Sequence, residues 1–561
     1  MAFNLTGAGS GEFHYLAEIF LSGTTLRYAD EDLSLVVSGG ATGYFYAGKL
    51  PAGGVLVRDL GTFLEAKEAI TNLDLTVDNS DGAQSTIINT YVLANKEVRV
   101  FLGEGEYRSG YSEVYRGNIA RPNGVRWDDD AATYTVIDKR IKDRRYLPLT
   151  TFSVTGAYPN VEARYKNTKV PIVFGNWSSA AGTSAELAKG LTVPAVMSST
   201  LTRTFTVAAH GLKGIDRILK NSVVLNPGQW INKNLTAATF RITGVAYDAT
   251  TDIMSVNCQG IATIGGSLIE KPGRVLRSLY TTFLGLTSGD LDLTAISDVD
   301  TASGNEVVRR FIDTEISSET LCAELLNESN TDLRFVRGKY SPKYRSMDLA
   351  AGTVQIYEDD LIARSEVPER AEFSVERDPD RFYANRIRSQ WRYDPINGVY
   401  NVGAQGSTPA YMVNDIAKQS EHGSVVERLL DFDWYYDDTL TKARVQRELS
   451  IFTKETLNIR LGLTRRAMGI NPADQVRLNY DVFSNRAVQI RRVENNFDDM
   501  TTRLSGFNLF MLGMGRWAND TDPSWSMASL DQRAAQGFWC DATGWASSAA
   551  DPTSYLASRW Y

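Results

Sequence analysis

Apolar and polar residues alternate strictly over several short stretches of the first 150 residues. The alternation is clear in Leu73–Val77, Val98–Leu102 and Tyr134–Val136. Because successive side chains of a strand point to opposite faces, this period of two predicts half-buried antiparallel strands. Residues that tolerate positive φ lie between such stretches, at Asp81-Gly82, Gly103-Glu-Gly105 and Asn123-Gly124. We therefore expect residues 1–150 to form one β-barrel or sandwich.

A second β-rich region is predicted at about residues 180–270, where Ser, Thr and Gly are frequent and Thr204–Val207 and Phe240–Ile242 have strand character. The apolar period then changes to three or four residues, which is typical of helices. Helices are predicted over Pro272–Gly285, Ser318–Ser329 and Leu440–Phe452, and strands again over Val476–Tyr480 and Ala487–Val493.

Charge limits the classes of function. The chain has 59 Lys or Arg and 67 Asp or Glu, a formal net charge of −8. This balance argues against a surface that grips nucleic-acid phosphates. A mildly acidic wall still allows DNA to pass without sticking, because it repels a polyanion.

The three cysteines, Cys258, Cys322 and Cys540, are widely spaced and form no C-x-x-C pair. Neither a disulfide scaffold nor a zinc ribbon is predicted, and Cys322 is expected to be a small core residue. The N-terminus lacks a basic start before its apolar residues, and no run of about 18 apolar residues occurs. We expect a chain that folds in a reducing cytoplasm, with no cleavable signal and no membrane span.

One stretch, Gly43–Lys49 (GYFYAGK), matches the spacing of a phosphate-binding loop. Leu50 replaces the hydroxyl residue that would bind Mg²⁺, and Pro51 opposes the helix that should follow. A strand and turn are predicted here instead. The acidic run Asp128-Asp129-Asp130 is interpreted as a solvated hairpin turn, because three consecutive carboxylates on a strand or turn do not converge.

Catalytic, cofactor and metal sites are not predicted. Only His14, His210 and His422 offer an imidazole base, and no G-x-S-x-G motif accompanies them, so a Ser/His/Asp hydrolase is disfavoured. A glycosidase needs only two carboxylates, and the 67 acidic residues leave that class open.

Five of the ten tryptophans fall within residues 511–561, namely Trp517, Trp525, Trp539, Trp545 and Trp560. Aromatic anchors in so short a segment are candidates for docking onto another surface, in this chain or in a second one. A small C-terminal subdomain packed on its own chain is the alternative.

Residues 145–175 connect the first β region to the next. Arg145–Pro148, Tyr158-Pro159 and Lys169–Gly175 (KVPIVFG) resemble the domain junction of bacteriophage tail hub proteins, the baseplate-hub or tail-tip family. In this candidate junction, Pro171 would remove one ladder donor and Gly175 would permit a sharp exit.

Later stretches are similar to the same family over about residues 1–510. The segment Val275–Leu293 resembles the helical patch of these hubs, and Phe373–Asp394 resembles the entry to their second barrel. The lead-in Ser420–Gly423 resembles the one before the family's own helix.

The resemblance implies a mainly β, multidomain fold class with a smaller α/β portion: two tube-like β-barrels plus inserted β and α/β modules. The expected divisions are a first hub β-barrel, a β-rich second module, an α/β module with helices, a second hub β-barrel and a Trp-rich docking segment, at 1–150, 151–270, 271–369, 370–510 and 511–561.

The resemblance also implies a structural, non-enzymatic role in the virion, at the tail tip or baseplate, after assembly in the host cytoplasm. Three copies would form a ring of six barrels that adapts six-fold to three-fold symmetry and leaves a DNA exit channel. The implied partners are the chain itself as a homotrimer, the distal tail protein or tail tube, the C-terminus of the tape-measure protein, and tail fibre or central tip proteins. Genomic DNA would be met only in passing, and no stable membrane insertion is expected.

Two other functions stay open on the sequence. A virion-associated glycan depolymerase or cell-wall hydrolase would need a carboxylate pair. A carbohydrate-binding receptor module would use the Trp-rich end for stacking against sugars.

Overall fold

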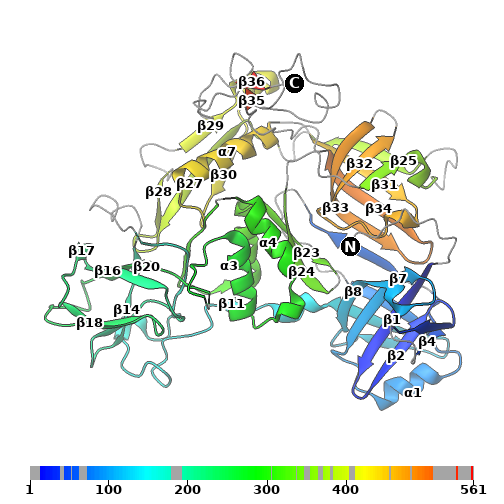
Figure 1. Cartoon of the computed structure of the whole chain (residues 1–561), viewed down its shortest axis with the longest axis horizontal. Coiled ribbons are helices and arrows are strands. Elements are labelled where there is room, and N and C mark those ends of the chain that lie inside the picture. The colour runs from blue at the N-terminus through cyan, green and yellow to red at the C-terminus, as the bar shows by residue number, and fades with distance from the viewer. Residues whose placement is uncertain are drawn as a thin grey trace.

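The computed structural model describes residues 13–37, 43–51, 54–61, 72–178, 192–263, 265–304, 306–336, 338–345, 354–363, 371–378, 383–402, 411–453, 456–480, 483–508, 539–540 and 558–559. The fold is mainly β and multidomain, with a smaller helical portion, as predicted (Figure 1). The division into five named domains stays a prediction.

The alternating stretches of the first 150 residues form one curved sheet, which we call the first β-unit. Its strands are β3 (Leu33–Val36), β4 (Gly43–Gly48), β2 (Thr24–Ala29), β1 (Phe13–Leu21), β7 (Glu97–Glu104), β8 (Tyr111–Ile119), β10 (Ala131–Asp138) and β6 (Asn72–Asp78) in spatial order, with β9 (Val125–Trp127) beside β10. The predicted phosphate-loop mimic is strand β4, and the acidic run forms the β9–β10 turn, where the Asp128 carboxylate accepts the backbone N–H of Ala131 at 2.8 Å.

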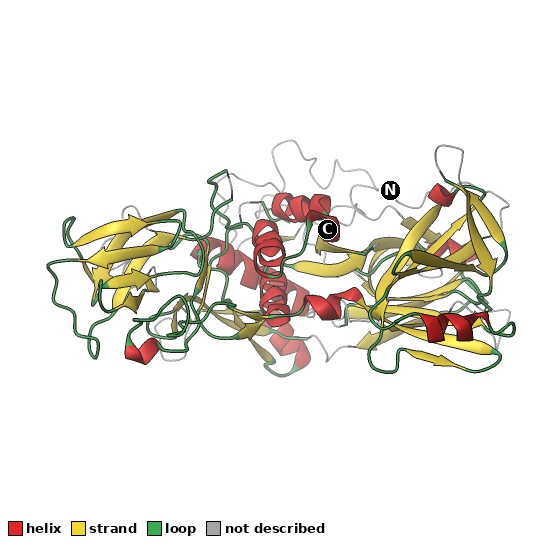
Figure 2. Cartoon of the chain, turned by 90° about the horizontal axis from the view of Figure 1, so that it is seen from below, coloured by secondary structure: helices red, strands yellow, loops and turns green. Residues whose placement is uncertain are grey.

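The first β-unit wraps round a core of its own inward side chains. Leu73, Leu75 and Val77 of β6 are all buried, as their alternation predicts. After β4 the chain joins the two sides of the sheet, because the N–H of Leu50 donates to Ala29 and the N–H of Asp78 donates to Lys49. The sheet is therefore curled into a barrel-like shape (Figure 2).

One helix of the first β-unit was not predicted. The Asp81-Gly82 pair was expected to close a hairpin, but Gly82, at φ 70°, precedes helix α1 (Ala83–Thr90). The helix carries Ile87 and Ile88 against the core of the unit, and buried Gln84 accepts hydrogen bonds from Tyr28 and Tyr134. Helix α1 is short and only weakly amphipathic in sequence, so the Asp81-Gly82 pair was interpreted as a hairpin turn and the helix was missed.

A second curved sheet, the second β-unit, forms from the C-terminal third of the described chain. Its strands are β25 (Val354–Tyr357), β32 (Gln475–Tyr480), β33 (Phe483–Asn496), β34 (Thr501–Asn508), β31 (Thr456–Leu463) and β26 (Phe373–Asp378) in spatial order. The chain leaving β25 reaches the far side of the sheet, because the N–H of Ile362 donates to Gly462 of β31 at 2.9 Å. The unit thus encloses its own apolar core, which includes Ile459, Leu461 and Val476.

A small β-module lies between residues 193 and 259 and packs two four-stranded sheets face to face. One sheet is β13 (Val193–Pro194), β20 (Met254–Gln259), β16 (Gly214–Lys220) and β17 (Val223–Val224); the other is β14 (Val196–Ser199), β15 (Thr204–Thr206), β19 (Thr239–Ile242) and β18 (Trp230–Asn234). In Figure 1 this β-module and the first β-unit lie at opposite ends of the longest axis.

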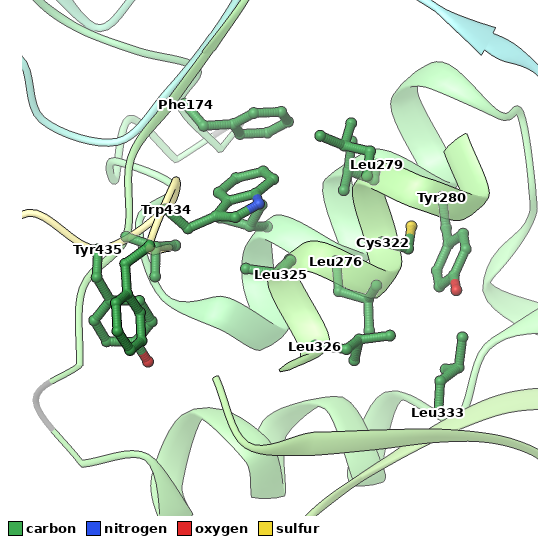
Figure 3. Packing of buried hydrophobic residues seen from close by; sticks show 14 of the residues in the cluster. Phe174, Leu276, Leu279, Tyr280, Cys322, Leu325, Leu326, Leu333, Trp434 and Tyr435 are labelled. Atoms are coloured by element: carbon green, nitrogen blue, oxygen red, sulfur yellow. The ribbon is translucent and has the colours of Figure 1, made fainter. Parts of the chain in front are cut away.

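Helices fill the centre of the molecule. The predicted helices are α3 (Pro272–Ser278, continued by a wider turn over Leu279–Phe283), α5 (Ser318–Glu328) and α7 (Asp438–Phe452), joined by α4 (Leu293–Ala302) and α6 (Ile416–His422). Short pairs lie beside them: β11 (Tyr146–Leu147) with β22 (Ile316–Ser317), β12 (Ile172–Phe174) with β21 (Arg310–Ile312), and β23 (Thr331–Val336) with β24 (Lys339–Tyr344). Figure 3 shows the shared core, in which Phe174 and Trp434 face Leu279 and Leu325. Cys322 is buried in this core, as expected.

A separate small sheet covers α7. Strand β27 (Arg386–Asp394) is its centre, with β30 (Glu427–Asp431) on one side and β28 (Val399–Val402) and β29 (Tyr411–Asn414) along the other. Among the described residues, no helix is both long and apolar enough to cross a membrane.

Candidate functional site at the junction of the two β-units

One strand links the two β-units, because its backbone pairs with the second unit and Leu56 packs in the core of the first. Strand β5 (Val55–Asp59) comes from the N-terminal part of the chain but pairs with residues Arg492–Asn496 of β33, antiparallel. The other half of β33 pairs with β32. The 14-residue strand β33 is therefore hydrogen-bonded to segments from both ends of the chain.

Side chains of the second β-unit complete the core of the first. Met468 and Phe497 are buried among the first unit's apolar residues, with Leu56 of β5 beside them. The ring of Phe497 stacks on Tyr15 of β1 at a centroid distance of 6.1 Å. The first unit, whose last strand ends at Asp138, is thus closed by two residues of the C-terminal part of the chain, Met468 and Phe497.

Polar contacts also hold the junction between β5 and β33, which we call the seam. The Arg58 guanidinium of β5 donates to Asn471 Oδ1 at 2.7 Å and to the Ile470 carbonyl at 3.1 Å. Next to β5, the N–H of Leu60 donates to the Arg491 carbonyl, and Arg491 Nη2 donates back to the Leu60 carbonyl, both at 2.9 Å. These bonds hold β5 against β33 beyond the end of the strand.

A buried ion cluster joins the seam to the helical centre. Asp332 of β23 is fully buried, and its Oδ1 lies 2.9 Å from both Arg345 Nε and Arg491 Nη1. Burial lowers the pKa of Arg345, and the carboxylate of Asp332 opposes that effect. Charges removed from water in this way depend on one another, so the cluster fixes the three segments in one arrangement.

A second carboxylate repeats this pattern nearer the surface. Asp474 Oδ1 lies 2.7 Å from Arg334 Nη1 and 2.7 Å from Lys343 Nζ, two residues of the β23–β24 hairpin. Burial works to raise the pKa of Asp474, but the two cations outweigh it and hold the pKa at about 2. The hairpin is therefore clamped to the second β-unit at ordinary pH.

The outer face of the second β-unit is polar and hollowed. Directly paired residues cross five strands in the order Ser374, Arg460, Ser505, Arg492 and Asp59. A pocket of about 550 Å³ lies over this row, where the short side chains of Ser374 and Ser505 alternate with arginines. The face continues onto β5, so it spans the seam.

Positive and negative charges alternate on this face. Arg503 Nε lies 2.8 Å from Glu372, Arg460 lies 3.2 Å from Glu376, and Arg492 lies 3.1 Å from Glu494. Glu372 and Glu494, the two carboxylates in the pocket, both contact Arg503.

The predicted junction residues flank strand β12. Pro171 directly precedes the strand, and Gly175 follows it with φ 74°. A Cβ atom at position 175 would lie 2.2 Å from the Val308 carbonyl oxygen, so the close approach requires glycine. The role of these two residues as a domain junction stays a prediction.

The candidate docking tryptophans are not brought together by the described structure. Trp517, Trp525, Trp545 and Trp560 lie outside the described residues, and only the backbone of Trp539 is described, in β35 (Trp539–Cys540) paired with β36 (Ser558–Arg559). Their docking role stays a prediction. In the part of the chain that the structure describes, no group of three His, Cys, Asp or Glu side chains is placed to hold a metal ion.

The residues that form the seam carry no sequence signal of their own. Arg58, Asp332 and Arg491 are charged residues, for which an exposed position is the usual prediction, yet all three are buried. Only the pairing of distant segments creates their environment.

No protein-family model and no curated protein matches the sequence. Several solved structures, however, are similar to the structure of this chain. The 43 kDa tail protein of prophage MuSo2 from Shewanella oneidensis has a TM-score of 0.38 at 11% identity, covering 88% of this chain and 98% of that one. The tail protein from Neisseria meningitidis MC58 has a TM-score of 0.34 at 9% identity, covering 88% and 96%.

A third similar structure is the prophage tail protein gp18 from Listeria monocytogenes EGD-e, with a TM-score of 0.37 at 8% identity, covering 85% of this chain and 94% of that one. All three are tail proteins, the class that the sequence resemblance names. At these TM-scores no residue's role is transferred from them.

Proposed function

We propose that the chain is a structural protein of a bacteriophage tail tip or baseplate, in which three copies form a ring at the distal end of the tail tube. The observation that carries the proposal is the seam: two curved β-units in one chain are joined where β5 pairs with β33 and where Met468 and Phe497 enter the core of the first unit. Two such units per chain allow three chains to present six similar surfaces to a six-fold tube and a three-fold surface to the tip.

The polar outer face across β26, β31, β34, β33 and β5 is the proposed wall of a DNA exit channel. Its arginines are neutralised by neighbouring carboxylates, and the chain as a whole is acidic. A wall of this kind gives phosphates no strong binding site, so a genome would pass without being held. The distal tail protein or tail tube, the tape-measure C-terminus and the tip or fibre proteins are the proposed partners.

The oligomeric state tests this function directly. The full-length protein, measured by light scattering and by averaged electron images, is expected to have the mass of three copies and to form a ring with a central opening. A monodisperse single copy over a wide concentration range would contradict the proposal.

Activity assays separate the structural role from the enzymatic one. We expect no turnover of bacterial polysaccharide or peptidoglycan by the purified protein. Turnover that is lost in the variant Glu372→Gln or Glu494→Gln would instead support the hydrolase.

A further inference from the structure

The outer end of the β-module exposes apolar side chains. Val223, Val224 and Ile253, which we call the module tip, surround the Asn221-Ser222 turn, and Val223 is 67% exposed. Asn221 holds the turn in place, because its side-chain Oδ1 accepts the N–H of Ile253 while its backbone N–H donates to the Ile253 carbonyl. A rigid, exposed cluster of β-branched residues is typical of an interaction surface.

The β-module is basic in an acidic chain. Residues 193–260 contain six Lys or Arg and three Asp or Glu, whereas the whole chain contains 59 and 67. At the tip itself, Lys220 lies opposite Val223 and pairs with Asp252 at 2.8 Å, so the positive excess belongs to the module as a whole. The β-module therefore fits a partner whose apolar centre lies in an acidic region.

The first β-unit carries such a surface. Val36, Phe45 and Tyr107 form what we call the hairpin patch, on the outward side of β3 and β4, and Phe45 and Tyr107 are 58% and 59% exposed. The three lie close together, because Val36 bridges Tyr107 and Ser34, two residues before Val36, pairs with Phe45.

Acidic residues lie on the chain segments beside the hairpin patch. Asp30, Glu31 and Asp32 lead into β3, and Glu106 directly precedes Tyr107. The ring of His14 lies 3.3 Å from carboxylate oxygens of Asp30 and Glu31. The nearby cations Arg27 and Arg108 are already paired with Glu18. The hairpin patch thus lies in an acidic region, whereas the module tip belongs to a basic module. Both surfaces expose apolar side chains.

The two surfaces lie far apart in one copy. Strand β17 of the module tip and strands β2 and β4 of the first β-unit mark the two ends of the longest axis (Figure 1). One copy does not bring its own tip to its own patch, whereas a head-to-tail arrangement of copies does so repeatedly. Such contacts generate a closed ring when the rotation between neighbouring copies closes.

We propose that the module tip of one copy docks onto the hairpin patch of the next copy. This contact rests on the proposed ring function, which it deepens by naming the surfaces that join neighbouring copies. The apolar residues supply the buried centre of the contact, and the basic module and acidic rim set its direction.

Matched charge substitutions test the contact. The variants Val223→Glu and Phe45→Glu are each expected to raise the concentration needed for half-assembly by about tenfold or more, as expected for a residue at the centre of an interface. The variant Val223→Lys is expected to assemble better than Val223→Glu, because the rim it meets is acidic. Leu201→Glu is the control, since Leu201 is 78% exposed on the same module but lies at a different turn.

Cross-linking identifies the partner surface. Protein with Val223→Cys mixed with protein with Phe45→Cys is expected to give a disulfide-linked dimer, while each protein alone, and a mixture with Leu201→Cys, does not. If wild-type protein forms rings, Val223→Glu and Phe45→Glu form them equally well, and the two cysteine variants give no cross-link, the proposed contact is wrong and the ring function stands. Monomeric wild-type protein would instead overturn the ring function itself.

Discussion

Asp332 is the residue on which the seam depends most directly. Its carboxylate faces two buried guanidinium groups, Arg345 and Arg491, and one of these also holds the backbone of Leu60. Removing a single member of such a cluster leaves uncompensated charge in a dry environment, which costs more than the cluster itself contributes.

We therefore expect Asp332→Asn to lower the free energy of unfolding by about 3–5 kcal/mol. Chemical denaturation followed by circular dichroism measures the loss. The control is Glu376→Gln, which removes the partner of Arg460 in an exposed pair and is expected to cost less than about 1 kcal/mol. Equal losses in the two variants would show that water reaches Asp332.

Buried charges of this kind mark the limit of what the sequence predicts at the residue scale. Cys322 was correctly placed in a core because it lies on the apolar face of a helix. Arg58 and Asp332 had no such context, because Asn471 beside Arg58 and Arg491 beside Asp332 are distant from them in the chain. A charge in an alternating strand is exposed in most proteins, and only tertiary pairing reverses that expectation here.

At the scale of elements, helix α5 carries a titrating group at its C-terminal end. The two carboxylate oxygens of Glu328 accept the backbone N–H groups of Asp433 and Trp434, each at 2.9 Å. Burial, and then the nearby charge of Asp433, raise the pKa of Glu328 to about 8. The helix end thus links the loop after β30 to the helical centre.

This shift predicts how stability changes with pH. Between the ordinary pKa of 4.5 and about 8, the native state keeps a proton on Glu328 that the unfolded state has lost. Stability is therefore expected to fall as pH rises through this window, and Glu328→Gln is expected to remove that part of the slope. Thermal unfolding between pH 5 and 8 measures it. Glu319→Gln, on the first turn of the same helix, is the control and should retain the wild-type slope; a wild-type slope in Glu328→Gln would mean that Glu328 is ionised throughout.

The elements themselves were largely predictable, and their partners were not. Leu73–Val77 became β6 and Ser318–Ser329 became α5 because the periods of two and 3.6 are local properties of the sequence. Strand β5 has the sequence VLVRD, which does not alternate, and nothing in these five residues indicates that β33 is its neighbour. Pairing across most of the chain depends on global shape, which a local pattern does not carry.

At the scale of the whole molecule, Phe497 joins the two β-units more than any other apolar residue described above. It lies just beyond β33 and is buried in the core of the first unit. Its loss is expected to be felt in both units, because the cavity opens between them.

We expect Phe497→Ala to cost about 3–5 kcal/mol and to speed amide hydrogen exchange in β1 as well as in β33. Leu504→Ala is the matched variant, because Leu504 is equally buried but packs only within the second unit. Its faster exchange is expected to stay within β31, β33 and β34. Exchange in Phe497→Ala that leaves β1 unchanged would show that the two units are independent.

The placement of Met468 and Phe497 also has a consequence for synthesis. While the ribosome is still making the middle of the chain, the first unit lacks two of its own core residues and the strand that β5 will join. The first β-unit therefore cannot complete its core until Phe497 has emerged from the ribosome. A product that ends before Met468 and Phe497 therefore has no completed first β-unit, so premature termination damages the part of the protein that is made first.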